Sequence, residues 1–202
     1  MFYRKVFFRK YVFKIYEHVY EPAEDSILFA ENLKVDPGSK VLDMGTGCGI
    51  LGIIAAEEAS SVIAVDINPY AVACARENAK INGVYDKMFF IRSDLFKAIR
   101  NGEKFDLIMF NAPYLPAEPA EDVDWIQWAW SGGPDGRAVI DRFLKSFPTH
   151  LAEDGRMLLM QSTLSNVDKT LEMLKAEGFA ARIIAEKSLP LFETITLIEA
   201  YR

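Results

Sequence analysis

The segment Asn111-Ala112-Pro113-Tyr114 combines residue types that suit chemistry on a planar nitrogen. The lone pair of an amide or exocyclic amino nitrogen is delocalised, so this nitrogen is a poor nucleophile. The Asn111 side-chain oxygen and the Ala112 carbonyl can accept its two N–H groups, which favours the positive charge that develops during attack without a strong general base. Pro113 biases Ala112 toward an extended conformation that would aim this carbonyl, and Tyr114 can stack on the planar group. The competing interpretation is an ordinary Asn-Pro turn.

A glycine-rich turn lies upstream, in the sequence VLDMGTGCG at residues 41–49. Gly45, Gly47 and Gly49 follow a buried apolar strand and allow a sharp turn into an apolar helix, so that a nucleoside can approach the backbone closely. The spacing is GxGxG, whereas the dinucleotide fingerprint needs glycine at the position of Ile50. This spacing favours S-adenosylmethionine over NAD as the ligand. The alternative is a tight strand-to-helix connection with no ligand.

Three carboxylates stand at positions that suit such a ligand. Asp66 ends the second strand, where it can accept both ribose hydroxyls; the alternative is a cap for the helix that begins at residues 68–69. Asp94 follows the third strand and is placed to receive the adenine amino group while Leu95 packs on the ring, and a helix cap is again the alternative. Asp43 can bind the amino group of a methionine moiety, or serve as a cap or turn residue.

From residue 40 onward, strand-like and helix-like segments alternate, which is typical of an α/β fold with a largely parallel sheet. Apolar runs predict strands at 40–44, 61–66, 87–92, 105–110 and 156–161, and an antiparallel pair at 180–186 and 194–201. Helices are expected at about 22–34, 49–58, 69–80, 136–151 and 165–177. Pro22 is expected in the first turn of the helix at 22–34. Ser165 or Asn166 is expected to cap the helix at 165–177, and Gly178 to end it.

Residues 111–135 interrupt this alternation with a connection expected to lack regular structure. The connection follows the carboxyl end of a strand, where open α/β sheets bind ligands, and its length indicates a functional loop. Its three tryptophans can pack against a protein partner or form an internal core for the loop. Its acids are Glu118, Glu121, Asp122 and Asp124, and its tryptophans are Trp125, Trp128 and Trp130.

Length and composition indicate one domain over residues 1–202, with an N-terminal extension at 1–18. The 202 residues are 50% hydrophobic and carry a net charge of -6, which does not suggest a protein that resides on nucleic acid or an anionic membrane. The basic residues near the start alternate with aromatic and apolar ones, so a signal peptide is not expected, and no later run reaches membrane-spanning length. We therefore expect a cytoplasmic protein.

The cysteines and histidines suggest no further chemistry. We expect Cys48 and Cys74 to be reduced and buried, and two cysteines are too few for a zinc site made by this chain alone. His18 and His150 stand outside any motif and are interpreted as structural or surface residues.

Together these motifs resemble the HemK-type family of S-adenosylmethionine-dependent methyltransferases, in particular the short archaeal and eukaryotic branch that modifies the glutamine of Gly-Gly-Gln in class-one translation termination factors. The similarity spans about residues 19–200. It implies a class I methyltransferase (Rossmann-like) fold, a seven-stranded, mostly parallel sheet with helices on both faces. Its most specific pieces are VYEPAEDS (19–26), LDMGTGCG (42–49), VDINPYAV (65–72), FNAPYLP (110–116) and WSGGPDGRAVIDRF (130–143).

The resemblance also implies site residues and partners. It implies S-adenosyl-L-methionine as cofactor, a release factor as protein substrate, and in some members a small zinc-binding activator subunit. The third strand is an edge in the family's sheet order, and here it carries an apolar run over 87–92 on which such a subunit, or a second copy of the chain, can pair. Substrate contacts are implied at Asn111 and Tyr114, and cofactor contacts at Ser26, Asp43, Gly45, Asp66, Asp94, Leu95 and Asn111.

One residue departs from the family pattern, which is Asn-Pro-Pro-Tyr. Ala112 replaces the first proline, so the carbonyl acceptor is kept but one fixed φ angle is lost. The expected consequence is weaker preorganisation of the loop, at roughly 0.4–1 kcal/mol through the entropy of the unfolded chain.

Glutamine methylation in a protein is the leading hypothesis, and three alternatives remain open. An adenine amino-methyltransferase acting on DNA or RNA fits the same motif, but the net acidity and the acidic 117–124 segment would repel phosphates. Protein lysine methylation would need a route for losing the ammonium proton, which the sequence does not display. A noncatalytic adapter could bind the cofactor for stability alone, although Asn111 and Tyr114 are both intact.

Overall fold

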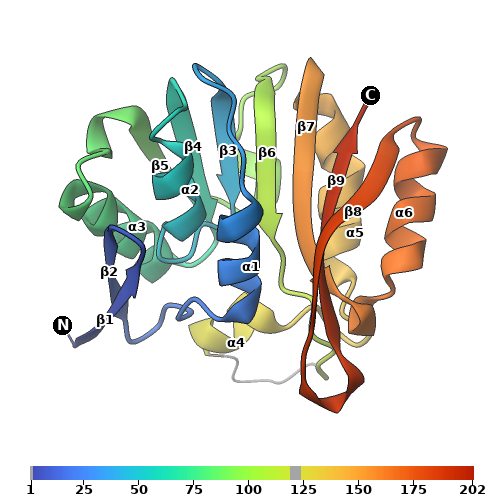
Figure 1. Ribbon diagram of the computed structural model, residues 1–202, viewed down its shortest axis with the longest axis horizontal. Helices are drawn as coiled ribbons and strands as arrows, with labels where there is room; N and C mark the ends of the chain where they lie inside the picture. The colour runs from blue at the N-terminus through green and yellow to red at the C-terminus, as the bar shows by residue number, and fades with distance from the viewer. Residues whose placement is uncertain (1, 119–123) are drawn as a thin grey trace.

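Seven strands form one sheet in the computed structural model, which describes residues 2–118 and 124–202 (Figure 1). Their order is β5-β4-β3-β6-β7-β9-β8. β9 runs antiparallel to both neighbours, and the other neighbouring pairs are parallel. The predicted mostly parallel sheet with an antiparallel final pair is therefore confirmed. The strands are β3 (Lys40–Met44), β4 (Ser61–Asp66), β5 (Met88–Arg92), β6 (Phe105–Asn111), β7 (Leu151–Ser162), β8 (Ala180–Ser188) and β9 (Thr194–Tyr201).

Helices cover both faces of this sheet, as predicted. The six α-helices of the described residues are α1 (Glu24–Asn32), α2 (Ile50–Ala55), α3 (Pro69–Ile81), α4 (Trp125–Trp130), α5 (Ala138–Ser146) and α6 (Val167–Ala176). α1, α2 and α3 contact one another in series, and α1 and α2 lie in front of the sheet in Figure 1, while α5 lies behind it. Leu42, Val62 and Ile108 of the central strands have no exposed surface. Burial on both faces explains why these strands are continuous apolar runs.

Two predicted helix ends are wrong, and both involve proline. Pro22 lies before α1 and not in its first turn. The helix predicted over 136–151 ends early because Pro148 has no N–H to continue it; a 3-10 turn then leads directly into β7, which is longer than predicted. Asn166, one of the two predicted caps, caps α6. No helix among the described residues has the length and apolar character needed to cross a bilayer.

The connection over 111–135 contains α4, a helix that the sequence did not predict. α4 carries all three tryptophans of the connection, and its last residue, Trp130, accepts a backbone hydrogen bond from Leu115. The predicted lack of regular structure is therefore wrong for this part. Residues 119–123, which include the predicted acids Glu121 and Asp122, lie outside the described residues.

The predicted N-terminal extension is an antiparallel hairpin of two strands, β1 (Tyr3–Phe8) and β2 (Tyr11–Tyr16). The free edge of β2 is satisfied by side chains of α3. Asn82 exchanges hydrogen bonds with the backbone N–H and C=O of Val12, and Asn78 does the same with Lys14. Two asparagines one helical turn apart thus replace a third strand and fix the hairpin to α3.

Candidate cofactor and substrate site

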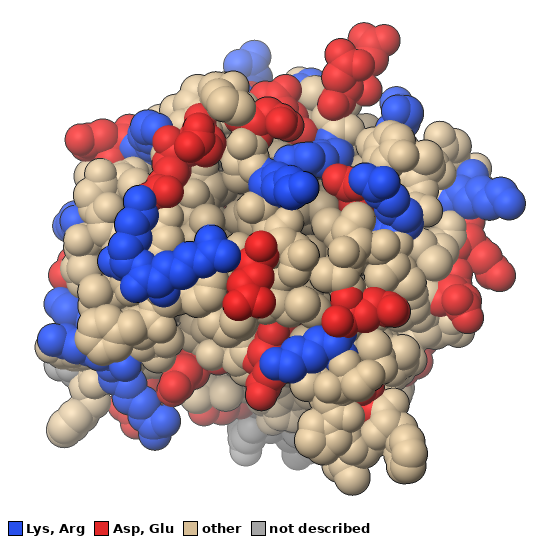
Figure 2. Space-filling view, viewed as in Figure 1, with Lys and Arg blue, Asp and Glu red and all other residues tan. Residues whose placement is uncertain are grey.

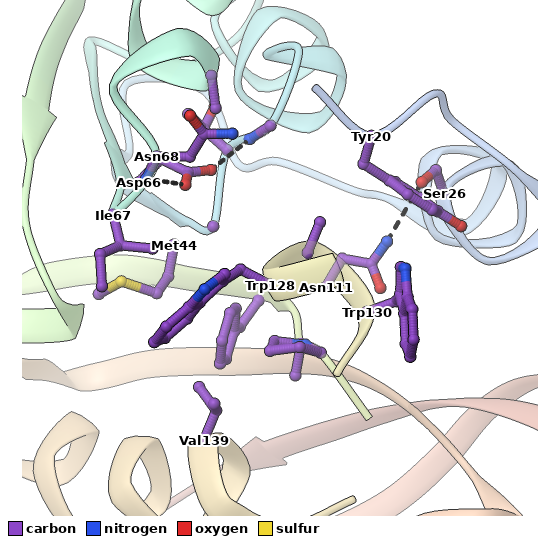
Figure 3. Close-up of a pocket in the computed structure, with 18 of the residues that line it drawn as sticks. Tyr20, Ser26, Met44, Asp66, Ile67, Asn68, Asn111, Trp128, Trp130 and Val139 are labelled. Atoms are coloured by element: carbon purple, nitrogen blue, oxygen red, sulfur yellow. Dashed lines mark hydrogen bonds between the residues drawn. The ribbon is translucent and has the colours of Figure 1, made fainter. Parts of the chain in front are cut away.

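A cavity of about 400 Å³ opens at the carboxyl ends of β3, β4 and β6 (Figure 3). Its volume lies within the range of small-ligand sites. Asp43 and Gly49, two predicted cofactor residues, are not among its lining residues. The structure brings the other predicted residues together at one end of the sheet. They are Ser26, Gly45, Gly47, Asp66, Asp94, Leu95, Asn111, Ala112, Pro113 and Tyr114.

The glycine turn forms one wall of the cavity with its backbone. Gly45 and Gly47 have φ angles of 65° and 56°, in the left-handed region that disfavours side chains. At Gly45 a Cβ atom would also lie 3.0 Å from the ring of Phe110. Gly49 serves a different purpose, because a Cβ atom there would lie 3.1 Å from Ala75 of α3. The third glycine therefore permits close packing of two helices, which explains its absence from the cavity wall.

Asp43 lies beneath the glycine turn. Its Oδ2 accepts hydrogen bonds from the Thr46 hydroxyl at 2.6 Å and from the Gly52 amide at 3.0 Å. Burial raises the pKa of Asp43 to about 7, although both hydrogen bonds act in the opposite direction. Of the two interpretations offered by the sequence, this geometry favours the turn role, in which the carboxylate ties β3 to α2.

Asp66 faces the cavity from the end of β4. Its Oδ2 accepts a hydrogen bond from the Gly47 amide at 2.9 Å, and its Oδ1 accepts one from the Asn68 amide at 2.9 Å. Asn68 itself caps α3, since its side-chain oxygen accepts from the Tyr70 amide. The capping role that competed for Asp66 thus belongs to Asn68. Burial raises the pKa of Asp66 to about 6, against the effect of these backbone hydrogen bonds.

Asp94 is bound by two cations at the rim of the cavity. Arg142 Nη2 lies 2.6 Å from both carboxylate oxygens, and Lys97 Nζ lies 2.7 Å from Oδ2. Burial acts to raise the pKa of Asp94, but hydrogen bonds from the two cations outweigh it and the pKa is lowered. The side chain makes no capping hydrogen bond, so the capping alternative is wrong.

Leu95 lines the cavity with a left-handed φ of 48°, a conformation that leucine rarely adopts. Arg142, which also lines the cavity, was not identified from the sequence.

Asn111 has an amide that is held by its nitrogen alone. Nδ2 donates to Asp25 Oδ2 at 3.1 Å and to Ser26 Oγ at 3.2 Å (Figure 3). Oδ1 is buried, and no described residue donates a hydrogen bond to it. Leaving a buried acceptor unpaired costs about 1–3 kcal/mol. The side chain of Asn111 therefore presents a fixed acceptor that suits the N–H group of a ligand.

Asp25 determines this orientation, although sequence reasoning missed it. Its Oδ1 accepts from the Ser26 amide at 2.6 Å, the Ser26 hydroxyl at 3.1 Å and the Tyr20 hydroxyl at 3.3 Å. Its Oδ2 accepts from Asn111 and from the Tyr114 hydroxyl at 3.4 Å. Burial raises the pKa of both tyrosines, so the phenols remain donors. Because a carboxylate only accepts, Asn111 must turn its NH₂ group toward Asp25 and its oxygen away.

The segment WSGGPDG at 130–136 supports the loop that carries Tyr114. The Leu115 amide donates to the Trp130 carbonyl at 2.9 Å, and the Gly132 amide donates to the Leu115 carbonyl at 2.8 Å. At Gly136 a Cβ atom would lie 2.3 Å from the Tyr114 carbonyl oxygen, so only glycine fits. This segment therefore acts as a backbone support for the loop.

Ala112, the departure from the family pattern, makes a contact that proline could not make. Its amide donates to the Met160 carbonyl of β7 at 3.4 Å, and the residue is buried. Proline has no N–H group, so this bond is available only because of the substitution. It compensates in part for the φ constraint that the loop has lost. The direction of the Ala112 carbonyl toward a substrate stays a prediction.

The tryptophans of α4 form the outer wall of the cavity. Trp125, Trp128 and Trp130 all line it, and Trp128 is 50% exposed. Their aromatic faces are therefore available to a planar group or to a bound protein. This arrangement favours the interpretation that the tryptophans pack against a protein partner over an internal core for the loop. Among the acids predicted beside them, Glu118 is exposed and Asp124 lies 3.5 Å from His18.

Of the two histidines and two cysteines, only Cys48 lines the cavity. His150 stacks on Phe96 with ring centroids 4.8 Å apart, and His18 packs on Tyr70, so neither lines the cavity. Both cysteines are free and buried, as predicted. The lining residues thus offer a carboxylate for hydroxyl groups and a fixed amide oxygen for an N–H group, with no imidazole to act as a base.

Comparisons with known proteins agree with this geometry. The family model described as the methyltransferase small domain matches residues 22–127. A putative protein N5-glutamine methyltransferase of Methanocaldococcus jannaschii is 42% identical over 191 residues, 94% of each chain. The human methyltransferase HEMK2 is 33% identical over 174 residues, 81% of this chain and 80% of that protein.

A solved structure is also similar. It is the E. cuniculi Mtq2-Trm112 complex, described as responsible for methylation of the eRF1 translation termination factor. The match has a TM-score of 0.70 and 26% identity, and it covers 92% of this chain and 99% of that chain. The family model, the two relatives and this shared fold show that the chain belongs to the HemK-type family of S-adenosylmethionine-dependent methyltransferases.

Proposed function

We propose that this methyltransferase modifies the side-chain amide nitrogen of the glutamine in the Gly-Gly-Gln motif of a class-one release factor. The observation that carries the proposal is the Asn111 amide, whose nitrogen is fixed by Asp25 and Ser26 while its buried oxygen lacks a donor. The name of the archaeal relative supports glutamine as the target, and the description of the E. cuniculi complex supports a translation termination factor as the substrate.

The residues of the cavity fit S-adenosylmethionine. Asp66 stands beside the glycine turn, where its carboxylate suits the ribose hydroxyls, and Leu95 offers an apolar contact to the adenine ring. Ser26, Gly45, Gly47, Asp94 and Asn111 complete the proposed cofactor residues, whereas Asp43 and Gly49 act from behind the cavity wall. The cofactor supplies an electrophilic methyl group on a sulfonium sulfur.

Asn111 and Ala112 orient the nitrogen that accepts this methyl group. Asn111 Oδ1 accepts one N–H of the substrate amide, and the Ala112 carbonyl accepts the other. With both N–H groups held, the positive charge that develops on the nitrogen is stabilised, and the leaving proton passes to water. Tyr114 and the tryptophans of α4 provide apolar surface around the planar amide. This mechanism requires no strong base.

The geometry disfavours lysine as substrate. A lysine ammonium must lose a proton before it can attack, and Asp25 is the carboxylate nearest to Asn111. Both of its oxygens already accept hydrogen bonds from protein donors, so Asp25 is occupied as a positioning group. Adenine presents a suitable NH₂ group, but the net charge of -6 opposes approach of a phosphate backbone.

Labelling with radioactive S-adenosylmethionine tests the proposed function. Three substrates are compared at physiological salt: a purified release factor, its variant with Gly-Gly-Asn in place of Gly-Gly-Gln, and an adenine-containing oligonucleotide. We expect label on the unmodified release factor alone. Label on the Gly-Gly-Asn variant would reject the glutamine assignment, and preferential label on the oligonucleotide would favour the adenine alternative.

Replacing Asp25 with alanine is expected to lower the turnover rate by about 10- to 100-fold, the scale of one hydrogen bond to a charged group. The Asn111 amide would then be free to rotate and present its NH₂ group to the substrate. Initial rates at saturating substrate measure the effect. Glu31→Ala, which removes an exposed carboxylate elsewhere on α1, is the matched control and should keep the rate of the unmodified enzyme. A rate for Asp25→Ala equal to that of Glu31→Ala would show that Asp25 does not orient Asn111.

The edge strand β5 is a proposed partner surface. Among the described strands it pairs only with β4, and Phe89 on it is 57% exposed. Apolar edge strands are templates for pairing with another chain. We propose that a small zinc-binding activator subunit, or a second copy of this chain, adds a strand here. The solved E. cuniculi relative is itself a complex with a second protein.

Phe89→Asp is expected to reduce complex formation with such a subunit by at least about 10-fold, because burial of one phenylalanine side chain stabilises an interface by about 1.5–3 kcal/mol. Co-expression followed by light scattering measures the complex. Phe7→Asp, at an exposed phenylalanine of the N-terminal hairpin, is the control. A soluble, fully active monomer with β5 uncovered would contradict the proposal.

A further inference from the structure

The connection between β8 and β9 exposes two large apolar side chains. Leu191 is 93% exposed and Phe192 is fully exposed, more than any other large apolar side chain of the described residues. Both adopt the left-handed backbone conformation, with φ angles of 63° and 64°. The loop is closed by a hydrogen bond from the Leu189 amide to the Glu193 carbonyl at 2.8 Å.

The two left-handed residues form the tight turn that joins β8 to β9, but their side-chain types are unusual for such a turn. The left-handed conformation is unfavourable for residues with a Cβ atom, and glycine would adopt it without strain. Full exposure means that Leu191 and Phe192 contribute no burial to the core. Strained backbone that positions exposed side chains is typical of functional sites. The turn geometry accounts for the backbone, whereas the full exposure of two large apolar side chains is what a partner would explain. We name Leu191 and Phe192 the apolar tip.

The apolar tip lies at the same end of the sheet as the cavity. Figure 1 shows the β8–β9 connection below the sheet, at the end where α4 also lies. α1, which supplies Asp25 and Ser26, packs against both β8 and β9. Beside the tip, Glu193 is close enough to Tyr114 and Tyr20 to contribute, after burial, to the raised pKa of both phenols. The tip therefore lies at the end of the sheet from which a protein would insert a side chain into the cavity.

The surroundings of the tip are polar, and acids outnumber basic residues there. In Figure 2 the tip is an uncharged projection at the lower edge of the molecule. Glu186 and Lys187 on β8 and Glu193 lie along the hairpin. Glu24 lies in the first turn of α1, and Glu21, which pairs with Arg4, lies just before it. An apolar point within a surface on which acids are in excess complements a partner that carries an apolar patch bordered by basic residues. Nucleic acid and anionic lipid do not match this combination.

The size of the tip limits the kind of complex. A stable dimer buries on the order of 1,200–2,000 Å² in total, whereas one aromatic side chain buries roughly 150–250 Å². Two side chains are too few for a permanent interface with a second copy. They suit a transient contact that adds to binding at the cavity.

We propose that Leu191 and Phe192 form a docking contact for the folded domain of the protein substrate, beside the loop that delivers its glutamine. This inference rests on the proposed function. The tip inserts into an apolar patch on that domain, while the acids around it face basic residues. It thereby selects the protein that carries the glutamine, a discrimination that Asn111 and Ala112 cannot make by contacting an NH₂ group alone.

Steady-state kinetics of the double variant Leu191→Gly/Phe192→Gly tests the proposal. Glycine removes both side chains and relieves the left-handed strain, so the melting temperature should not fall. We expect KM for the release factor to rise at least about 10-fold, with kcat at saturation and the affinity for S-adenosylmethionine unchanged. Leu191→Ser/Phe192→Ser keeps the strain and removes the apolar surface, so it should raise KM equally. Phe7→Ser, on the distant N-terminal hairpin, should have no effect.

The outcomes separate this inference from the proposed function. If the unmodified enzyme labels the release factor and both double variants keep its KM, the docking role is wrong and the proposed function stands. A fall in kcat with unchanged KM would also overturn it, because the loop would then act on the cavity. If the unmodified enzyme transfers no methyl group to the release factor, both proposals fail together.

Discussion

Replacing Asn111 with alanine is expected to lower the rate of methyl transfer by at least about 100-fold, the loss that follows removal of one group hydrogen-bonded to a transition state. The substitution removes Oδ1, the buried acceptor without a protein donor. The positive charge that develops on the substrate nitrogen then loses its main partner. Initial rates at saturating cofactor and release factor measure the change, and circular dichroism establishes that the protein remains folded.

Two further variants make this test specific. Asn111→Asp keeps the size of the side chain but places a second carboxylate beside Asp25, so the orienting hydrogen bond at 3.1 Å becomes a repulsion and activity should again be lost. Asn101→Ala removes an exposed asparagine in the turn before β6 and should leave the rate unchanged. Turnover like that of the unmodified enzyme in a folded Asn111→Ala variant would reject the mechanism.

The parts of the fold that the sequence predicts well are those determined by local patterns. β3 and β4 match their predicted limits because central parallel strands are buried on both faces and therefore read as continuous apolar runs. The cavity could be anticipated for a related reason. Asp66 and Asn111 each end such a strand, and the carboxyl ends of parallel strands meet at one end of the sheet.

The parts that the sequence did not predict depend on contacts between distant segments. Asp25 orients Asn111 across a separation of 86 residues, and no local pattern indicates that its carboxylate turns toward β6. Arg142 reaches Asp94 from α5 in the same way. The position of Asp43 in the glycine turn was visible, but the direction of its side chain was decided by the Thr46 hydroxyl and the Gly52 amide.

Asp66→Ala is expected to weaken S-adenosylmethionine binding by about 1.5–3 kcal/mol, the scale of hydrogen bonds to a charged acceptor. Isothermal titration calorimetry measures this difference. Part of the loss would come from the Gly47 amide, which now donates to Asp66 at 2.9 Å and helps to shape the glycine turn. Asp86→Ala, at an exposed acid just before β5, is the matched control. Unchanged affinity in a folded Asp66→Ala variant would remove the ribose role.

The pKa of Asp66 makes the same affinity depend on pH. Burial raises this pKa to about 6, so the carboxylate is mainly ionised above that pH and mainly protonated below it. Ribose hydroxyls donate more strongly to the ionised form, and affinity for S-adenosylmethionine should therefore fall as the pH is lowered through about 6. By linkage, cofactor binding near this pH should release a proton, which calorimetry in two buffers of different ionisation enthalpy detects.

Asp43 must be separated from this effect, because burial raises its pKa to about 7 and it lies beneath the glycine turn that Asp66 contacts. Asp66→Asn keeps the shape of the side chain but cannot titrate, so proton release near pH 6 should disappear in this variant while any step that belongs to Asp43 remains. An affinity in the unmodified enzyme that is constant from about pH 5 to about pH 8, a range that spans the ionisation of a carboxyl with a raised pKa, would show that the charge of Asp66 does not bind the cofactor.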